Sequence, residues 1–65
     1  MFVIIIWSDR NSGKFSKMLK GFGIKYTTDY DDDSYYFYFD DKANENEKEL
    51  IDMILNQCEI EHIKI

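Results

Sequence analysis

The sequence is poor in residues that crosslink, ligate metals or catalyse. Cys58 is the only cysteine, so no disulfide can form within the chain and a zinc site would lack its usual thiolates. His62 is the only histidine, and the sequence suggests no nucleophile or second base to work with it. We therefore expect a protein that is not an enzyme and that holds no metal and no cofactor.

Long apolar segments are also missing. Residues 2–7 are apolar, but no basic segment precedes them and Ser8, Asp9 and Arg10 follow directly. A secretory signal has a basic start before its apolar core, and a membrane span needs about 20 apolar residues. With 65 residues and one cysteine, the sequence predicts a single small domain, 1–65, that stays in the reducing cytoplasm and has no membrane partner.

The composition is that of a folded chain. Apolar residues make up 45% and aromatic residues 17% of it, which is too much for a disordered polypeptide. Phe, Tyr, Met, Ile, Asn and Lys, whose codons are AT-rich, account for 33 residues. This bias favours a small gene of a low-GC bacterium, its phage or a mobile element.

The charge of −5 is unevenly distributed. Residues 1–25 contain five basic residues and one acidic residue, a net charge of +4, whereas residues 26–65 contain three basic and twelve acidic residues, a net charge of −9. A molecule with such separated charge presents a basic surface and an acidic surface, and either can attract a partner of opposite sign.

The first half of the chain predicts a strand, a helix and a second strand. Residues 2–7 are β-branched or aromatic without a break, which is typical of a strand that is central in its sheet. A helix follows, with Asn11 or Ser12 as its expected N-cap and Gly21 or Gly23 as its end. Its apolar stripe is formed by Phe15, Met18, Leu19 and Phe22. Residues 24–30 then alternate between apolar or aromatic and polar side chains, as a strand with one buried face does.

The second half predicts a hairpin partner, a helix and a closing strand. Residues 31–34 are typical of a turn, and residues 35–39 form an aromatic strand. Asn44 and Glu47 resemble a capping box, and a second helix follows with one apolar face. That face comprises Leu50, Ile51, Ile54 and Cys58. Residues 59–65 are expected to form the last strand.

The predicted order is therefore β-α-β-β-α-β. Two right-handed split β-α-β crossovers convert this order into a four-stranded antiparallel sheet with both helices on one face, which is the ferredoxin-like α+β arrangement. Strands 1 and 3 are central in that arrangement, and they are also the most apolar strands of this sequence. Pattern and topology agree.

With helices on one face, the other sheet face is open. On strand 3, we assign Tyr35, Phe37 and Phe39 to the core and Tyr36 and Tyr38 to the open face, because water satisfies a tyrosine hydroxyl. Strand 1 presents a further apolar row there, consisting of either Phe2, Ile4 and Ile6 or Val3, Ile5 and Trp7. Because apolar patches mark interfaces, we expect a homodimer, formed by this face or by edge pairing.

The aromatic run Tyr36, Phe37, Tyr38 and Phe39 on the third strand, beside an apolar first strand, resembles the RNA-recognition motif, which stacks bases on those two strands. The basic residue and the glycine that precede the aromatic residues in that motif are absent here. Acidic residues in the turn 31–33 and at 40–41 surround the sheet and would repel phosphates. We therefore do not expect nucleic acid on the sheet.

Acidic residues gather on the hairpin and on the second helix. The candidate partner-binding residues are Asp29, Asp31, Asp32, Asp33, Asp40, Asp41, Glu45 and Glu49. Carboxylates arranged in this way can imitate duplex phosphates, so the sequence predicts a non-enzymatic module that binds a basic host protein and blocks its nucleic-acid site, as DNA-mimic inhibitors do.

Two other interpretations remain open. The carboxylates can serve solubility alone, because like charges keep a small protein dispersed. Alternatively, the protein is a small nucleic-acid-binding module that uses the lysines of the first helix, Lys14, Lys17 and Lys20.

Overall fold

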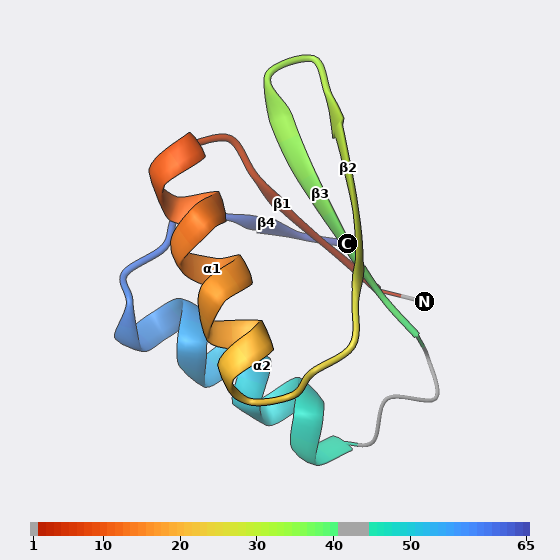
Figure 1. Ribbon diagram of the computed structural model, residues 1–65, viewed down its shortest axis with the longest axis vertical. Helices are drawn as coiled ribbons and strands as arrows, with labels where there is room; N and C mark the ends of the chain where they lie inside the picture. The colour runs from red at the N-terminus through yellow and green to blue at the C-terminus, as the bar shows by residue number, and fades with distance from the viewer. Residues whose placement is uncertain (1, 41–44) are drawn as a thin grey trace.

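The computed structural model describes residues 2–40 and 45–65 and contains two helices and a four-stranded antiparallel sheet (Figure 1). The elements are β1 (Phe2–Ile6), α1 (Asp9–Gly21), β2 (Thr27–Asp31), β3 (Ser34–Phe39), α2 (Glu45–Gln57) and β4 (Ile63–Lys64). The strand order is β2-β3-β1-β4, so the first and third strands are central. The predicted ferredoxin-like α+β fold is confirmed.

The register between β1 and β3 decides which side chains face the helices. Ile4 lies opposite Phe37 and Phe2 opposite Phe39, and the Phe2 and Phe39 rings stack with their centroids 4.9 Å apart. The intervening pairs, Val3 with Tyr38 and Ile5 with Tyr36, point to the other face because successive side chains alternate. The predicted assignment of the phenylalanines to the core and of Tyr36 and Tyr38 to the open face is therefore correct.

The core lies between the sheet and both helices. Phe15 is fully buried, and its ring meets that of Phe37 edge to face at 4.9 Å. The buried apolar side chains form one cluster: Ile4, Ile6, Phe15, Leu19, Ile24, Phe37, Phe39, Ile51, Ile54, Leu55 and Ile60. Both helices thus contribute to one core on one side of the sheet, as predicted. Cys58 packs against its rim.

Both helices end in the same hydrogen-bonded motif. In α1, Gly23 has a φ of +72°, and the Gly23 and Ile24 amides donate to the Lys20 and Leu19 carbonyls. In α2, Glu59 has a φ of +53°, and the Glu59 and Ile60 amides donate to the Asn56 and Leu55 carbonyls. This is the Schellman pattern, in which a left-handed residue ends the helix and the next residue turns back toward the core. Ile24 and Ile60 are accordingly buried.

The start of α1 was predicted incorrectly. Ser8, not Asn11 or Ser12, is the N-cap, and its hydroxyl accepts a hydrogen bond from the Asn11 amide at 3.2 Å. A serine before Asp9 satisfies one of the free amides of the first turn, and the aspartate suits the positive end of the helix dipole. The helix therefore begins within the segment expected to be a loop, and Ser12 is buried.

The ends of other elements also differ from the predictions. Phe22 was placed on the buried stripe, but α1 ends at Gly21 and Phe22 is 53% exposed. The last strand covers only Ile63–Lys64, because Glu59 and Ile60 complete the end of α2. β2 begins at Thr27, and Asn44 of the expected capping box lies outside the described residues.

Candidate functional site

The turn between β2 and β3 carries the densest negative charge. Asp31 pairs with Ser34 at the end of the ladder, which leaves Asp32 and Asp33 as a two-residue loop. Both have positive φ, 52° and 61°, which is the requirement of a type I′ hairpin turn. Aspartate tolerates the left-handed region better than most residues, so the local sequence is compatible with this turn.

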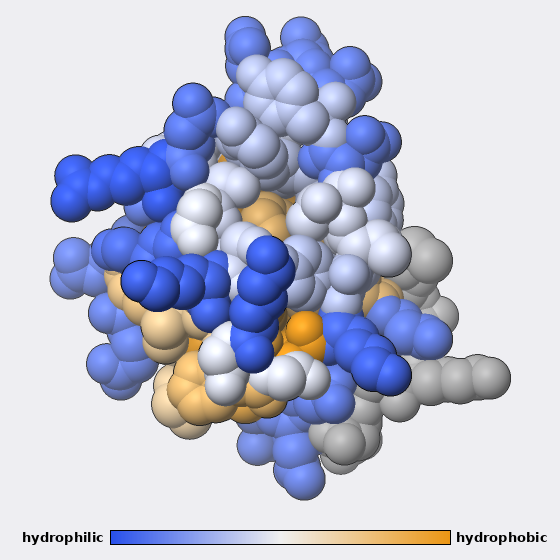
Figure 2. Space-filling model, in the orientation of Figure 1, coloured by the Kyte–Doolittle hydropathy of each residue, from blue (hydrophilic) through white to orange (hydrophobic). Residues whose placement is uncertain are grey.

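The acidic tip, which we define as Asp29, Asp31, Asp32 and Asp33, projects from the body of the protein (Figure 1). Every residue of β2 is exposed, and hydrophilic atoms gather at this end of the molecule (Figure 2). Within the described part of the chain, no cationic side chain forms an ion pair with these aspartates. Their charge therefore faces solvent uncompensated.

Two tyrosines of the hairpin, Tyr30 and Tyr35, form hydrogen bonds with carboxylates. The Tyr30 hydroxyl donates to the Asp33 carboxylate at 3.2 Å, and the Tyr35 hydroxyl donates to the carboxylate of Asp9 on α1. The Tyr30 and Tyr35 rings lie 4.7 Å apart. The hydrogen bond to Asp9 raises the pKa of Tyr35 to about 12, and the bond to Asp33 raises the pKa of Tyr30, because each carboxylate stabilises the protonated phenol. Sequence patterns gave no sign of the Tyr35–Asp9 contact, since 26 positions separate the partners.

Of the other predicted acidic residues, the structure describes Asp40 and Glu49, and neither belongs to the acidic tip. Asp40 follows β3 at the end remote from the turn, close to the start of α2 (Figure 1). Glu49 is exposed on α2, whereas Asp41 and the side chain of Glu45 fall outside what the structure describes. The acidic tip precedes β3 and Asp40 follows it, so the six residues of this strand separate them. The predicted set is thus two separate groups.

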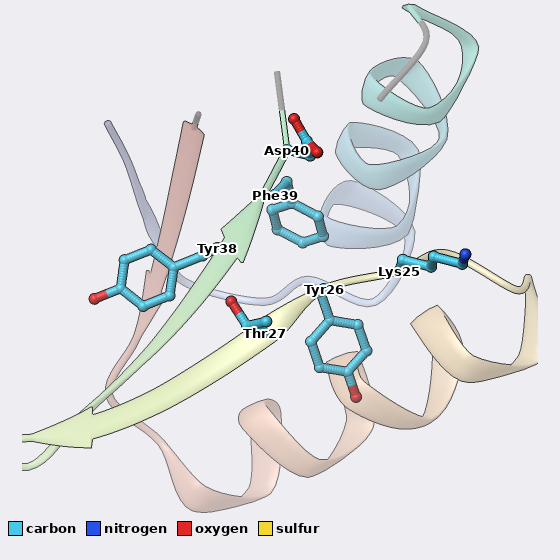
Figure 3. Close-up of a pocket in the computed structure, with 6 residues that line it drawn as sticks. All are labelled: Lys25, Tyr26, Thr27, Tyr38, Phe39 and Asp40. Atoms are coloured by element: carbon cyan, nitrogen blue, oxygen red, sulfur yellow. The ribbon is translucent and has the colours of Figure 1, made fainter. Parts of the chain in front are cut away.

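A shallow hollow of about 350 Å³ lies beside Asp40 (Figure 3). Its lining residues are Lys25, Tyr26, Thr27, Tyr38, Phe39 and Asp40. Tyr38 and Tyr26 point in different directions in Figure 3, because they belong to opposite faces of the sheet. The lining groups do not converge on one point, so the hollow lacks the arrangement of a small-molecule site.

The open face of the sheet carries the apolar patch that the sequence predicted. Of the two possible rows on β1, Val3, Ile5 and Trp7 is the outward one, and Trp7 is 45% exposed. Tyr36 and Tyr38 lie beside it, half-buried, with stacked rings 6.4 Å apart. Ile63 and Ile65 extend the patch across β4. Their spacing of two residues is typical of one face of a strand and could have placed both on the patch from the sequence.

A basic stripe runs along α1. Its members are Arg10, Lys14, Lys17 and Lys20, which are all exposed and share one side of the helix. In the part of the chain that the structure describes, none of them forms an ion pair.

Comparisons with protein-family models, with curated proteins and with solved structures find no match to this chain. Among the described residues, no three His, Cys, Asp or Glu side chains are grouped as metal ligands would be. No helix in that part of the chain is both long and apolar enough to cross a membrane.

Proposed function

We propose that this protein is a non-enzymatic binding module whose acidic tip inserts into a basic groove of a host protein and blocks its nucleic-acid site. It acts in the cytoplasm as a homodimer and is encoded by a phage or a mobile element. The proposal rests on the acidic tip and not on the larger surface expected from the sequence, since Asp40 follows β3 at the end remote from the turn and Glu49 belongs to α2.

The observation that carries this proposal is the pair of left-handed aspartates. A left-handed residue other than glycine costs on the order of 1 kcal/mol, and Asp32 and Asp33 are two such residues in succession. An Asn-Gly turn adopts the same shape with less strain and without charge. Carboxylates at this position oppose stability, both through the backbone and through mutual repulsion, which supports a role for them in binding.

Exposed charge on a projecting turn also suits recognition by a basic partner. Complementary charge accelerates encounter and makes association depend on salt, and the groups nearest the centre of the contact contribute most. Asp31, Asp32 and Asp33 are exposed at the end of the hairpin and are not part of the core. Asparagine substitutions should therefore leave the core intact, and an amide oxygen at position 33 can still accept the hydrogen bond from the Tyr30 hydroxyl.

The test is a triple variant, Asp31→Asn, Asp32→Asn and Asp33→Asn. Asparagine keeps the shape and tolerates positive φ, so circular dichroism and the melting temperature should be retained or slightly raised. Binding to a basic protein captured from host lysate should weaken tenfold or more, equivalent to about 1.4 kcal/mol. Double-stranded DNA should compete with the wild-type protein for that partner.

The matched control changes the basic stripe through Lys14→Gln, Lys17→Gln and Lys20→Gln. These side chains are exposed on α1 and outside the core, so this variant should fold and bind the partner normally. If the aspartate variant binds normally and the lysine variant does not, the acidic tip is not the binding surface.

A second candidate function rests on the basic stripe itself. The four exposed cations of this stripe lie on one side of a helix and can contact a phosphate backbone. This alternative predicts salt-sensitive retention of the wild-type protein on heparin and on immobilised DNA, abolished in the lysine variant. The acidic-tip proposal predicts no retention on either.

A further inference from the structure

We infer that the open face of the sheet binds a second copy of this chain through a twofold axis parallel to β1. The side chains that point to this face form rows across the four strands. The rows of β1 and β4 are aliphatic, that of β3 is aromatic and that of β2 is polar and acidic. In strand order, the residues are Thr27, Asp29 and Asp31, then Tyr36 and Tyr38, then Val3 and Ile5, then Ile63 and Ile65.

The apolar half of this face is exposed in the isolated chain. Ile63 is 51% and Ile65 72% exposed, and Trp7, which continues the outward alternation of β1, is 45% exposed. Both helices cover the opposite face, so no element among the described residues shields these side chains. A contiguous apolar patch of this kind marks an interface in small soluble proteins.

Lys64, the one basic residue of β4, does not point to the open face. Lys64 lies opposite Ile4 and so points to the helix side, where its ammonium group pairs with Asp52 at 3.2 Å. The same group sits 5.7 Å from the centroid of the Phe2 ring. With no basic side chain in the rows of β1, β3 and β4, and with Asp29 and Asp31 in the row of β2, this face repels a nucleic-acid backbone.

The asymmetry of the rows favours a second copy over another occupant. Rotation about a twofold axis along β1 stacks β1 on its counterpart and places β4 of each protomer over β3 of the other. Apolar rows then meet apolar or aromatic rows, whereas the acidic β2 rows lie on opposite flanks and avoid each other. Both acidic tips stay exposed in this arrangement, so the proposed function and the dimer are compatible.

The area of the open sheet face limits how much surface two copies can bury against each other. β1, β2 and β3 are roughly 17 Å long and β4 is less than half that length, so at a strand spacing of about 4.8 Å the face spans roughly 280 Å² of flat area. Even with the added relief of side chains, each protomer contributes less than the ~800 Å² of a standard interface. We therefore expect a weak, reversible dimer.

The experiment uses the purified protein alone, which separates it from the test of partner binding. Sedimentation velocity over a concentration series should show a reversible shift from the 7.8 kDa monomer to the dimer. Trp7 is the only tryptophan, and its fluorescence should shift to shorter wavelength over the same range because the dimer buries it. The asparagine triple variant of the acidic tip should dimerise like the wild type.

The decisive variant is Ile63→Lys with Ile65→Lys, which introduces charge on the face at residues outside the core. It should raise the dissociation constant at least tenfold. The matched control is Phe22→Lys, an equally exposed apolar residue at the end of α1, which should leave dimerisation unchanged. A wild-type monomer at millimolar concentration, equal dimerisation of the Ile63/Ile65 variant, or binding of single-stranded DNA to this face would each overturn the inference.

Discussion

Replacing Phe15 and Phe22 by alanine should give opposite results, although both residues belong to the same apolar pattern in the sequence. Phe15 is fully buried and packs edge to face against Phe37 and, at 6.3 Å, against Phe39. Phe22 is the C-cap of α1, lies beyond the last helical turn and is 53% exposed. The two substitutions remove the same atoms from very different surroundings.

The expected cost of Phe15→Ala follows from this burial. A buried phenylalanine removes about 200 Å² of mostly apolar surface from water, which at ~25 cal/mol per Å² is an upper bound of about 5 kcal/mol. Comparable core truncations cost about 3–5 kcal/mol. A core of this size supplies only about 3–5 kcal/mol of net stability, so the Phe15→Ala protein should be largely unfolded at 25 °C. Phe22→Ala should change stability by less than about 0.5–1 kcal/mol.

Urea unfolding followed by circular dichroism, at one low protein concentration, measures both effects. Since a largely unfolded Phe15→Ala protein gives no folded baseline, the milder Phe15→Leu, with an expected loss of about 1–1.5 kcal/mol, belongs in the same series. The assignment of the core is wrong if Phe15→Ala retains a cooperative transition near the wild-type midpoint, or if Phe22→Ala costs as much as Phe15→Ala.

Two further predictions concern the end of a helix and a tyrosine. Glu59→Gly should stabilise the protein by about 1 kcal/mol and raise its melting temperature by about 4–8 °C, because Glu59 occupies in α2 the left-handed position that Gly23 fills in α1. Gly23→Ala should lower the melting temperature. Variants that melt at the same temperature as the wild type would contradict both predictions. The pKa of Tyr35 is raised from the ordinary 10.0 to about 12 in the folded protein. The protonated hydroxyl therefore stabilises the folded state below pH 10, and this contribution is lost as the pH rises from 10 to 12. Tyr35→Phe should therefore lose less stability over that interval in pH-dependent urea titrations, and an unchanged pH profile would refute the role of the Tyr35–Asp9 hydrogen bond.

The order of elements and the central strands followed from local patterns. The unbroken apolar run of β1 and the aromatic run of β3 favour central positions in the sheet, and the ferredoxin-like arrangement of the six elements gives both strands such positions. The alternation in β3 also separated Phe37 and Phe39 from Tyr36 and Tyr38, because a strand has only two faces. These inferences needed no knowledge of distant contacts.

The incorrect predictions concern the ends of helices and contacts between residues that are distant in the sequence. Phe22 fits the helical spacing, but the Schellman motif closes α1 one residue earlier and turns Ile24 into the core instead. Ser8 lacked the glutamate three residues later that makes a capping box easy to recognise. The hairpin and α2 were expected to share one acidic surface, although the predicted strand over 35–39 already separated Asp40 from the turn, as β3 does in the structure.

The register of β1 has a consequence for the rate of folding. The hairpin of β2 and β3 closes through a two-residue loop, an event of roughly 1–10 µs for an isolated hairpin. β1, in contrast, pairs with β3 residues about 30 positions away and with β4 residues about 60 positions away, and loop-closure entropy slows such contacts. The acidic hairpin can therefore form early, whereas β1 docks on β3 later and β4, which pairs only with β1, docks last. Until β1 docks, its unbroken apolar sequence is accessible to other chains, so the refolding yield should fall as protein concentration rises.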